Sequence, residues 1–110
     1  MTTTTEEQIT RTVYMNLSTE SLMLIEATMY RYEEQLKNFT YPVLVLTEKI
    51  VSATVELKTN KTEQLYKDLD KANKELKTVM QARANIQAAL DGCNLLRTDR
   101  IAQDNLLRGL

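Results

Sequence analysis

The sequence predicts an all-α fold, either a helical hairpin or an elongated coiled-coil bundle, and three observations support this. Apolar residues recur at alternating steps of three and four over long stretches, which is the spacing of a coiled-coil seam. Two glycines and one proline in 110 residues leave few of the turn formers that a multi-stranded sheet needs. Aromatic residues make up only 5% of the chain, whereas coiled coils are built mainly from aliphatic side chains.

The sequence predicts a disordered tail over residues 1–8, and a single helical coiled-coil domain over the remaining residues, 9–110. The hydroxyl side chains of Ser18 and Thr19 can accept hydrogen bonds from the free amides of a helix start, so the first long helix is predicted over 18–38. Its apolar stripe advances by steps of three and four and consists of Leu22, Ile25, Met29, Tyr32, Leu36 and Phe39.

Two patterns overlap in residues 43–57, after Pro42, which fits only a first helical turn. A seam with helical spacing consists of Val43, Leu46, Ile50, Ala53 and Leu57. A strict alternation of apolar and polar residues over 51–58 is instead typical of a half-buried strand, and the β-branched residues there favour it. The absence of a Gly or Asn turn before Ile50 favours the helix. We predict a helix over 43–58, with a short β-hairpin at 43–57 as the alternative.

The longest helix is predicted over residues 60–91. Asn60 and Glu63 are spaced as a capping box ahead of a long apolar run. The seam of this run consists of Leu65, Leu69, Ala72, Leu76, Val79, Arg83, Ile86, Leu90 and Cys93. Arg83 is the polar position in this seam, and such positions can set the register of a coiled coil. We therefore hypothesise that Arg83 faces a carboxylate of a partner.

A fourth helix is predicted over residues 93–108, separated from the third by Gly92. The tetrad Asn-Leu-Leu-Arg at 94–97 recurs at 105–108, eleven residues or three helical turns later, which places both copies on one face. Leu106 and Leu107 near the C-terminus must be buried or presented to a partner, because exposed apolar patches promote association.

The chain has few residues suited to catalysis. It contains no His, the commonest general base and metal ligand, and its two glycines form no phosphate-binding loop. Cys93 lies on an apolar seam, which predicts a buried and unreactive thiol. Glu26, Glu33 and Glu34 have helical spacing but lack the Glu-x-x-His pairs of di-metal bundles. We expect no enzymatic activity, no cofactor and no metal.

The charge pattern argues against several classes of partner. A net charge of −1, with scattered basic residues, gives little attraction to nucleic acid or to anionic lipid. No stretch reaches the roughly 18 apolar residues of a membrane span. Binding at a membrane surface is also not expected, because the seams are narrow and Trp is absent. A lone cysteine and the lack of a signal-peptide pattern predict a soluble intracellular protein, most simply a cytoplasmic one.

These features predict a non-enzymatic coiled-coil subunit that assembles with other helical chains into a homo- or hetero-oligomeric complex. If the chain folds back at Pro42, its short arm covers only part of the long arm, and the remaining stripe is free for a partner. The predicted interface consists of Leu22, Ile25, Met29, Tyr32, Leu36, Leu65, Leu69, Leu76, Val79, Arg83, Ile86, Leu90, Leu96, Leu106 and Leu107. A second candidate for recognition is a set of flexible Met and amphipathic Tyr side chains, at Met15, Met23, Met29, Tyr14, Tyr30 and Tyr32.

The alternative function is a small helical chaperone or adaptor that binds a client protein. If residues 43–57 formed a β-hairpin between two helices, the order helix, hairpin, helix would resemble the prefoldin family. That resemblance would imply a chaperone fold and client binding. Helical secretion chaperones of similar size fit the same overall layout.

Overall fold

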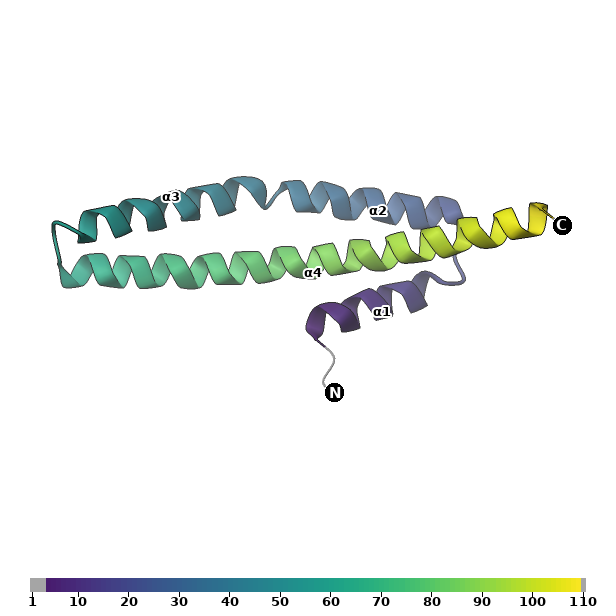
Figure 1. The fold of residues 1–110 in the computed structure, drawn as a ribbon, viewed down its shortest axis with the longest axis horizontal. Coiled ribbons are helices and arrows are strands. Elements are labelled where there is room, and N and C mark those ends of the chain that lie inside the picture. Colours follow the sequence, from purple (N-terminus) through teal and green to yellow (C-terminus); the bar gives the residue numbers. More distant parts are fainter. Residues whose placement is uncertain (1–3, 110) are drawn as a thin grey trace. The chain divides into compact units, whose positions relative to one another are not determined.

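The computed structural model describes residues 4–109. These residues form four α-helices and no strand (Figure 1). The helices are α1 (Thr5–Leu17), α2 (Leu22–Lys37), α3 (Thr40–Leu57) and α4 (Glu63–Arg108). Their packing divides the chain into two compact units. Unit 1 contains the described residues up to Leu36 and from Ala84 onward, and unit 2 is Lys37–Arg83. The predicted all-α helical hairpin is confirmed.

Unit 1 contains three helical segments, in which α1 runs parallel and α2 antiparallel to the C-terminal half of α4 (Figure 1). Ile25 of α2 and Cys93 of α4 are fully enclosed, and Leu96 is 4% exposed. Partly buried side chains pack around these three, namely Val13, Tyr14, Leu17, Met29 and Tyr32. The apolar stripe predicted for the first long helix is therefore the surface that forms this core.

The link between α1 and α2 is attached to α4 by Arg100. Its Nη1 donates to the carbonyl oxygen of Glu20 at 3.0 Å, and its Nη2 donates to the carbonyl oxygen of Ser18 at 2.6 Å. These carbonyls belong to the chain between α1 and α2, where no helical partner is available to satisfy them. The guanidinium thus holds both helices against α4 by charge-assisted hydrogen bonds.

The predicted N-terminal tail is wrong from residue 5 onward, because α1 begins there. The hydroxyl of Thr4 accepts a hydrogen bond from the amide of Glu7 at 3.1 Å, which caps the helix. Two glutamates in the first turn favour the same start through the helix dipole. Residues 1–3 of the predicted tail lie outside the described residues. Similarly, Ser21 caps the next helix by accepting from the backbone amide of Leu24 at 3.2 Å, so α2 begins at Leu22, four residues later than predicted.

The predicted helix boundary at Gly92 is also wrong, since α4 continues through it. A Cβ atom at position 92 would lie 2.5 Å from the carbonyl oxygen of Thr10 and 3.2 Å from Cβ of Val13. Glycine is therefore required by the close approach of the α1 backbone and not by a turn. The hydroxyl of Thr10 also donates to the carbonyl oxygen of Ala88, one turn earlier in α4, at 2.8 Å.

Unit 2 pairs α3 with the N-terminal half of α4 in an antiparallel hairpin joined by residues 58–62 (Figure 1). Its buried side chains are Leu46, Leu57 and Ala72. The β-hairpin alternative for residues 43–57 is wrong, and the resemblance to the prefoldin family, which depended on that hairpin, is lost with it.

The alternation that suggested a strand has a helical explanation. Residues two apart on a helix are separated by about 200°, so they point to nearly opposite sides. Val51 and Val55 are exposed, whereas Ala53 is half-buried and Leu57 is buried. The segment is therefore a helix that is apolar on two opposite faces, and this produces the same two-residue period as a strand.

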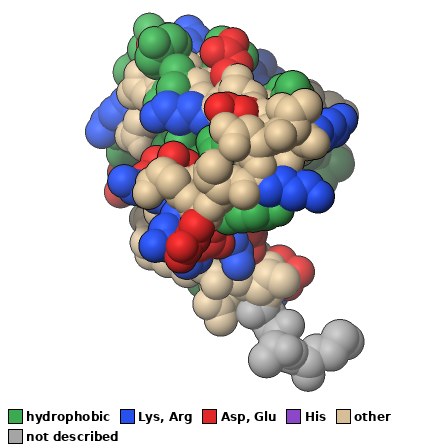
Figure 2. Space-filling view, turned by 90° about the vertical axis from the view of Figure 1, so that its left-hand side faces the viewer, with side chains coloured by type: hydrophobic (Ala, Val, Ile, Leu, Met, Phe, Trp, Pro, Cys, Tyr) green, Lys and Arg blue, Asp and Glu red, His purple; other side chains and the backbone are tan. Residues whose placement is uncertain are grey.

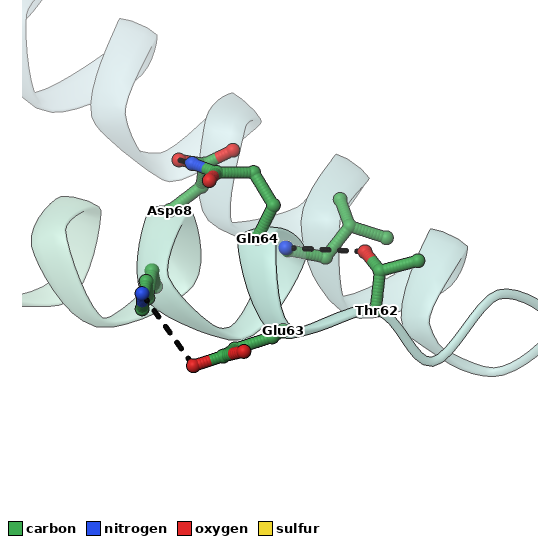
Figure 3. A network of polar contacts seen from close by, with 6 residues as sticks. Thr62, Glu63, Gln64 and Asp68 are labelled. Carbon is green, nitrogen blue, oxygen red and sulfur yellow. Dashed lines mark hydrogen bonds and ion pairs between the residues drawn. The ribbon is translucent and has the colours of Figure 1, made fainter.

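The start of α4 is capped by Thr62 and not by Asn60 (Figure 3). The hydroxyl of Thr62 accepts from the amide of Leu65 at 3.3 Å. The backbone N–H of Asn60 instead donates to the carbonyl oxygen of Glu56 at 2.9 Å, so Asn60 lies in the loop just after α3 and is tied to its C-terminal end. The predicted capping box at Asn60 is therefore wrong, and α4 begins at Glu63.

Candidate helix-binding surfaces

Most of the predicted interface residues are at least half-buried within the chain. Ile25 and Leu96 lie in the core of unit 1. The half-buried residues are Leu22, Met29, Tyr32, Leu36, Leu65, Leu69, Leu76, Val79, Ile86 and Leu90. Three predicted residues are exposed: Arg83, Leu106 and Leu107. Most of these residues thus provide packing within the two units, and their role in binding a partner remains a prediction.

Helix α3 carries an apolar stripe that was missing from the predicted interface. Tyr41, Leu44, Val51 and Val55 are 73%, 52%, 56% and 58% exposed. At 100° per residue these four positions lie within an arc of about 80°. We call this set the outer face of α3. The sequence signal that could have identified it is the alternation over 51–58, which places apolar residues on both sides of the helix.

A groove runs between α3 and α4 within unit 2, with a volume of about 700 Å³. We call it the α3–α4 groove. Its lining residues are Val45, Glu48, Lys49, Ser52, Ala53, Glu56, Leu65, Asp68, Lys71, Ala72 and Glu75. Six of these eleven residues are charged, and four of the six are acidic. Figure 2 shows one face of the molecule, on which hydrophobic side chains lie among acidic and basic ones.

A second groove, of about 690 Å³, lies between α1 and α4 within unit 1. Its lining residues are Glu6, Glu7, Thr10, Arg11, Tyr14, Met15, Ala84, Gln87, Ala88, Asp91 and Leu95. Met15 and Leu95 are 64% and 55% exposed at this groove. Two members of the predicted Met and Tyr set, Tyr14 and Met15, therefore line this groove. Tyr14 also packs against the core, as do Met29 and Tyr32.

Two side chains of unit 1 have shifted acidities. The phenol of Tyr14 donates to Oδ2 of Asp99 at 2.6 Å, and this hydrogen bond raises the pKa of Tyr14 above its ordinary value of 10.0. Burial raises the pKa of the Cys93 thiol above 9.0. A thiol that is both enclosed and protonated is a poor nucleophile, in line with the predicted unreactive Cys93.

Within residues 4–109, no cluster of three or more His, Cys, Asp or Glu side chains is arranged to hold a metal ion. In the same part of the chain, no helix combines the length and apolarity needed to cross a membrane. The chain matches no protein-family model, no curated protein and no solved structure.

Proposed function

We propose that the protein is a non-enzymatic helical subunit that assembles with other helical chains into a larger complex. The observation that carries this proposal is the outer face of α3. A helix that is apolar on opposite sides is usually covered on both, and α4 covers only one. The opposite side presents Tyr41, Leu44, Val51 and Val55 to solvent.

The small internal core supports the same proposal. Among the described residues, eight hydrophobic residues are buried, and four of these are alanine or cysteine. Thirteen large hydrophobic side chains in the same part of the chain are exposed. A short chain with so small a core has little stability of its own, whereas association would bury further apolar area at about 25 cal/mol per Å².

The test is to place charges on the outer face of α3 and to measure assembly. The double variant Val51→Glu with Val55→Glu removes apolar surface from the exposed stripe. The matched control, Thr47→Glu with Thr54→Glu, adds the same charge at exposed polar positions of the same helix. We expect the valine variant to dissociate the complex and the threonine control to retain it, with equal helicity by circular dichroism.

Two measurements cover both kinds of assembly. Multi-angle light scattering on the purified full chain reports homo-oligomers, and affinity capture with mass spectrometry, compared between the two variants, reports hetero-oligomers. A monomer with a sharp thermal transition, together with a set of captured proteins that is the same for both variants, would overturn the proposal.

A further inference from the structure

We propose that the α3–α4 groove binds a helix of a partner protein that carries basic residues seven or eight positions apart. The inference rests on the proposed assembly function and specifies the chemistry of the partner. Four properties of the groove support it: its length, its floor, the position of its carboxylates and its poor fit to α1 of a second copy.

The dimensions of the groove suit about three turns of helix. Its lining spans residues 45–56 of α3 and 65–75 of α4. At 1.5 Å per residue, both spans are about 15 Å long or slightly more. Such a length accommodates the apolar anchors at i, i+3 or i+4, and i+7 by which an amphipathic helix binds in a groove.

The floor of the groove is apolar and partly small. Val45, Ala53 and Leu65 are half-buried and Ala72 is 8% exposed. The two alanines leave room for side chains of a third helix above the contact between α3 and α4. This floor can therefore receive Leu or Ile from a partner.

The carboxylates of the groove form an acidic pair at each end. Because α3 and α4 are antiparallel, Glu56 and Asp68 lie towards the connecting loop, and Glu48 and Glu75 lie towards the other end. The two members of a pair come from different helices and both are exposed, so a cation of a partner can approach them from solvent. Along each helix the acids are seven or eight residues apart, about 10 to 12 Å, which sets the spacing of the partner's basic residues.

The chain itself does little to neutralise these acids. Within residues 4–109, Glu48, Glu56 and Glu75 form no ion pair, and Asp68 accepts only from the neutral amide of Gln64, at 2.8 Å. Two lysines in the lining, at 49 and 71, reduce the charge of the groove from −4 to −2. An arginine of a partner can form two parallel hydrogen bonds to a carboxylate, so it matches these positions well.

The helix α1 of a second copy is a poor occupant by comparison. Positions 71 and 92 of α4 are 21 residues apart, which is three heptads, so they are equivalent in a coiled coil. At position 92 glycine permits the close approach of α1, whereas at position 71 the side chain is lysine. The first turn of α1 also carries Glu6 and Glu7, which would face a groove of the same charge.

The probe is a fluorescein-labelled amphipathic peptide of about 20 residues, long enough to hold a helix, with Leu at steps of three and four and Arg at i and i+7. A matched peptide carries Glu in place of Arg. Fluorescence anisotropy with the full chain should show binding of the Arg peptide and not of the Glu peptide. Glu48→Lys with Glu75→Lys should weaken binding of the Arg peptide by about threefold to tenfold, since two attractive contacts at exposed positions become repulsive ones.

A second variant and a control keep the result interpretable. Glu56→Lys with Asp68→Lys reverses the other acidic pair and should have a similar effect. Glu33→Lys with Asp104→Lys makes the same change in net charge at exposed positions outside the groove and should leave the affinity unchanged. Equal binding of the two peptides, or equal affinity in all variants, would overturn the inference.

Failure of this inference can be told apart from failure of the proposed function. If the valine variant still disrupts assembly but the Arg peptide does not bind, the proposed role of the α3–α4 groove is wrong and the proposed assembly function stands. If the peptide binds the groove but the chain forms no complex that depends on the outer face of α3, the proposed function is wrong. If the chain self-associates and reversal of Glu48 and Glu75 abolishes this, the occupant is a second copy, which overturns the assignment to a partner protein.

Discussion

Replacing Gly92 by alanine is the sharpest test of how α1 packs against α4. The added Cβ would lie 2.5 Å from the carbonyl oxygen and 3.2 Å from the carbonyl carbon of Thr10. Both atoms belong to the backbone of a helix, so neither can move by a change of rotamer. Relief requires α1 to shift as a body, and this breaks the packing of Val13 against the core. Overpacking of this kind costs about 1–3 kcal/mol.

A second effect of Gly92→Ala has the opposite sign. Alanine in a helix interior is favoured over glycine by about 0.5–1 kcal/mol. The expected net loss in the free energy of unfolding is therefore about 0–2.5 kcal/mol, with a central value of about 1 kcal/mol, measured by urea denaturation followed by circular dichroism. Hydrogen exchange should locate the loss, because the amides of α1 should exchange faster while those of unit 2 should not.

The control for this experiment is Gly109→Ala. A Cβ there would have its nearest contact at 3.4 Å, an ordinary van der Waals distance, so only the backbone preference changes. We expect Gly109→Ala to leave the protection of α1 unchanged. If Gly92→Ala instead stabilises the protein and preserves the protection of α1, the close approach at position 92 is refuted.

Three further predictions concern the core and the titratable groups of unit 1. Ile25→Ala should lower the free energy of unfolding by about 2–5 kcal/mol in urea denaturation, because the side chain is fully enclosed. Met23→Ala, at a position that is 81% exposed, should change the free energy of unfolding by about 0.5 kcal/mol or less. Equal effects of the two substitutions would contradict the placement of Ile25 in the core. The raised pKa of Tyr14 favours the folded state below the ordinary value of 10.0. This contribution is lost as the pH rises through the folded pKa. Above pH 10 the free energy of unfolding of the Tyr14→Phe variant should therefore fall less steeply than that of the unchanged protein. Parallel pH profiles of the two proteins would contradict this prediction. Cys93 should react with a thiol reagent on the order of a hundredfold more slowly in the native state than in urea, because an opening of about 3 kcal/mol is needed. Rapid reaction without denaturant would show that the thiol is accessible.

The sequence predicted the seams correctly as helical but did not reveal which surfaces they face. The steps of three and four from Leu22 to Leu36 follow the side-chain geometry of a single helix, so they are visible without a structure. Whether such a stripe packs on the same chain or on another depends on how the helices fold back on each other. In the structure, Ile25 of this stripe is enclosed by α4 and α1.

The candidate surfaces depend even more on tertiary structure. The predicted interface omitted the outer face of α3, since the alternation at 51–58 fitted both a strand and a helix with two apolar faces. The carboxylates of the α3–α4 groove are far apart in the sequence. Glu56 and Asp68 are grouped only because the hairpin reverses the chain direction between them.

The helical class and the apolar stripes were determined by the sequence alone, because local geometry and backbone preference act over three to four residues. The role of Gly92 was decided only by the tertiary structure. Its sequence context predicts a helix end, since glycine favours termini and weakens helix interiors. The reason for glycine at this position is the backbone of Thr10, 82 residues earlier, whose approach leaves no room for a Cβ. No local rule could reveal that contact.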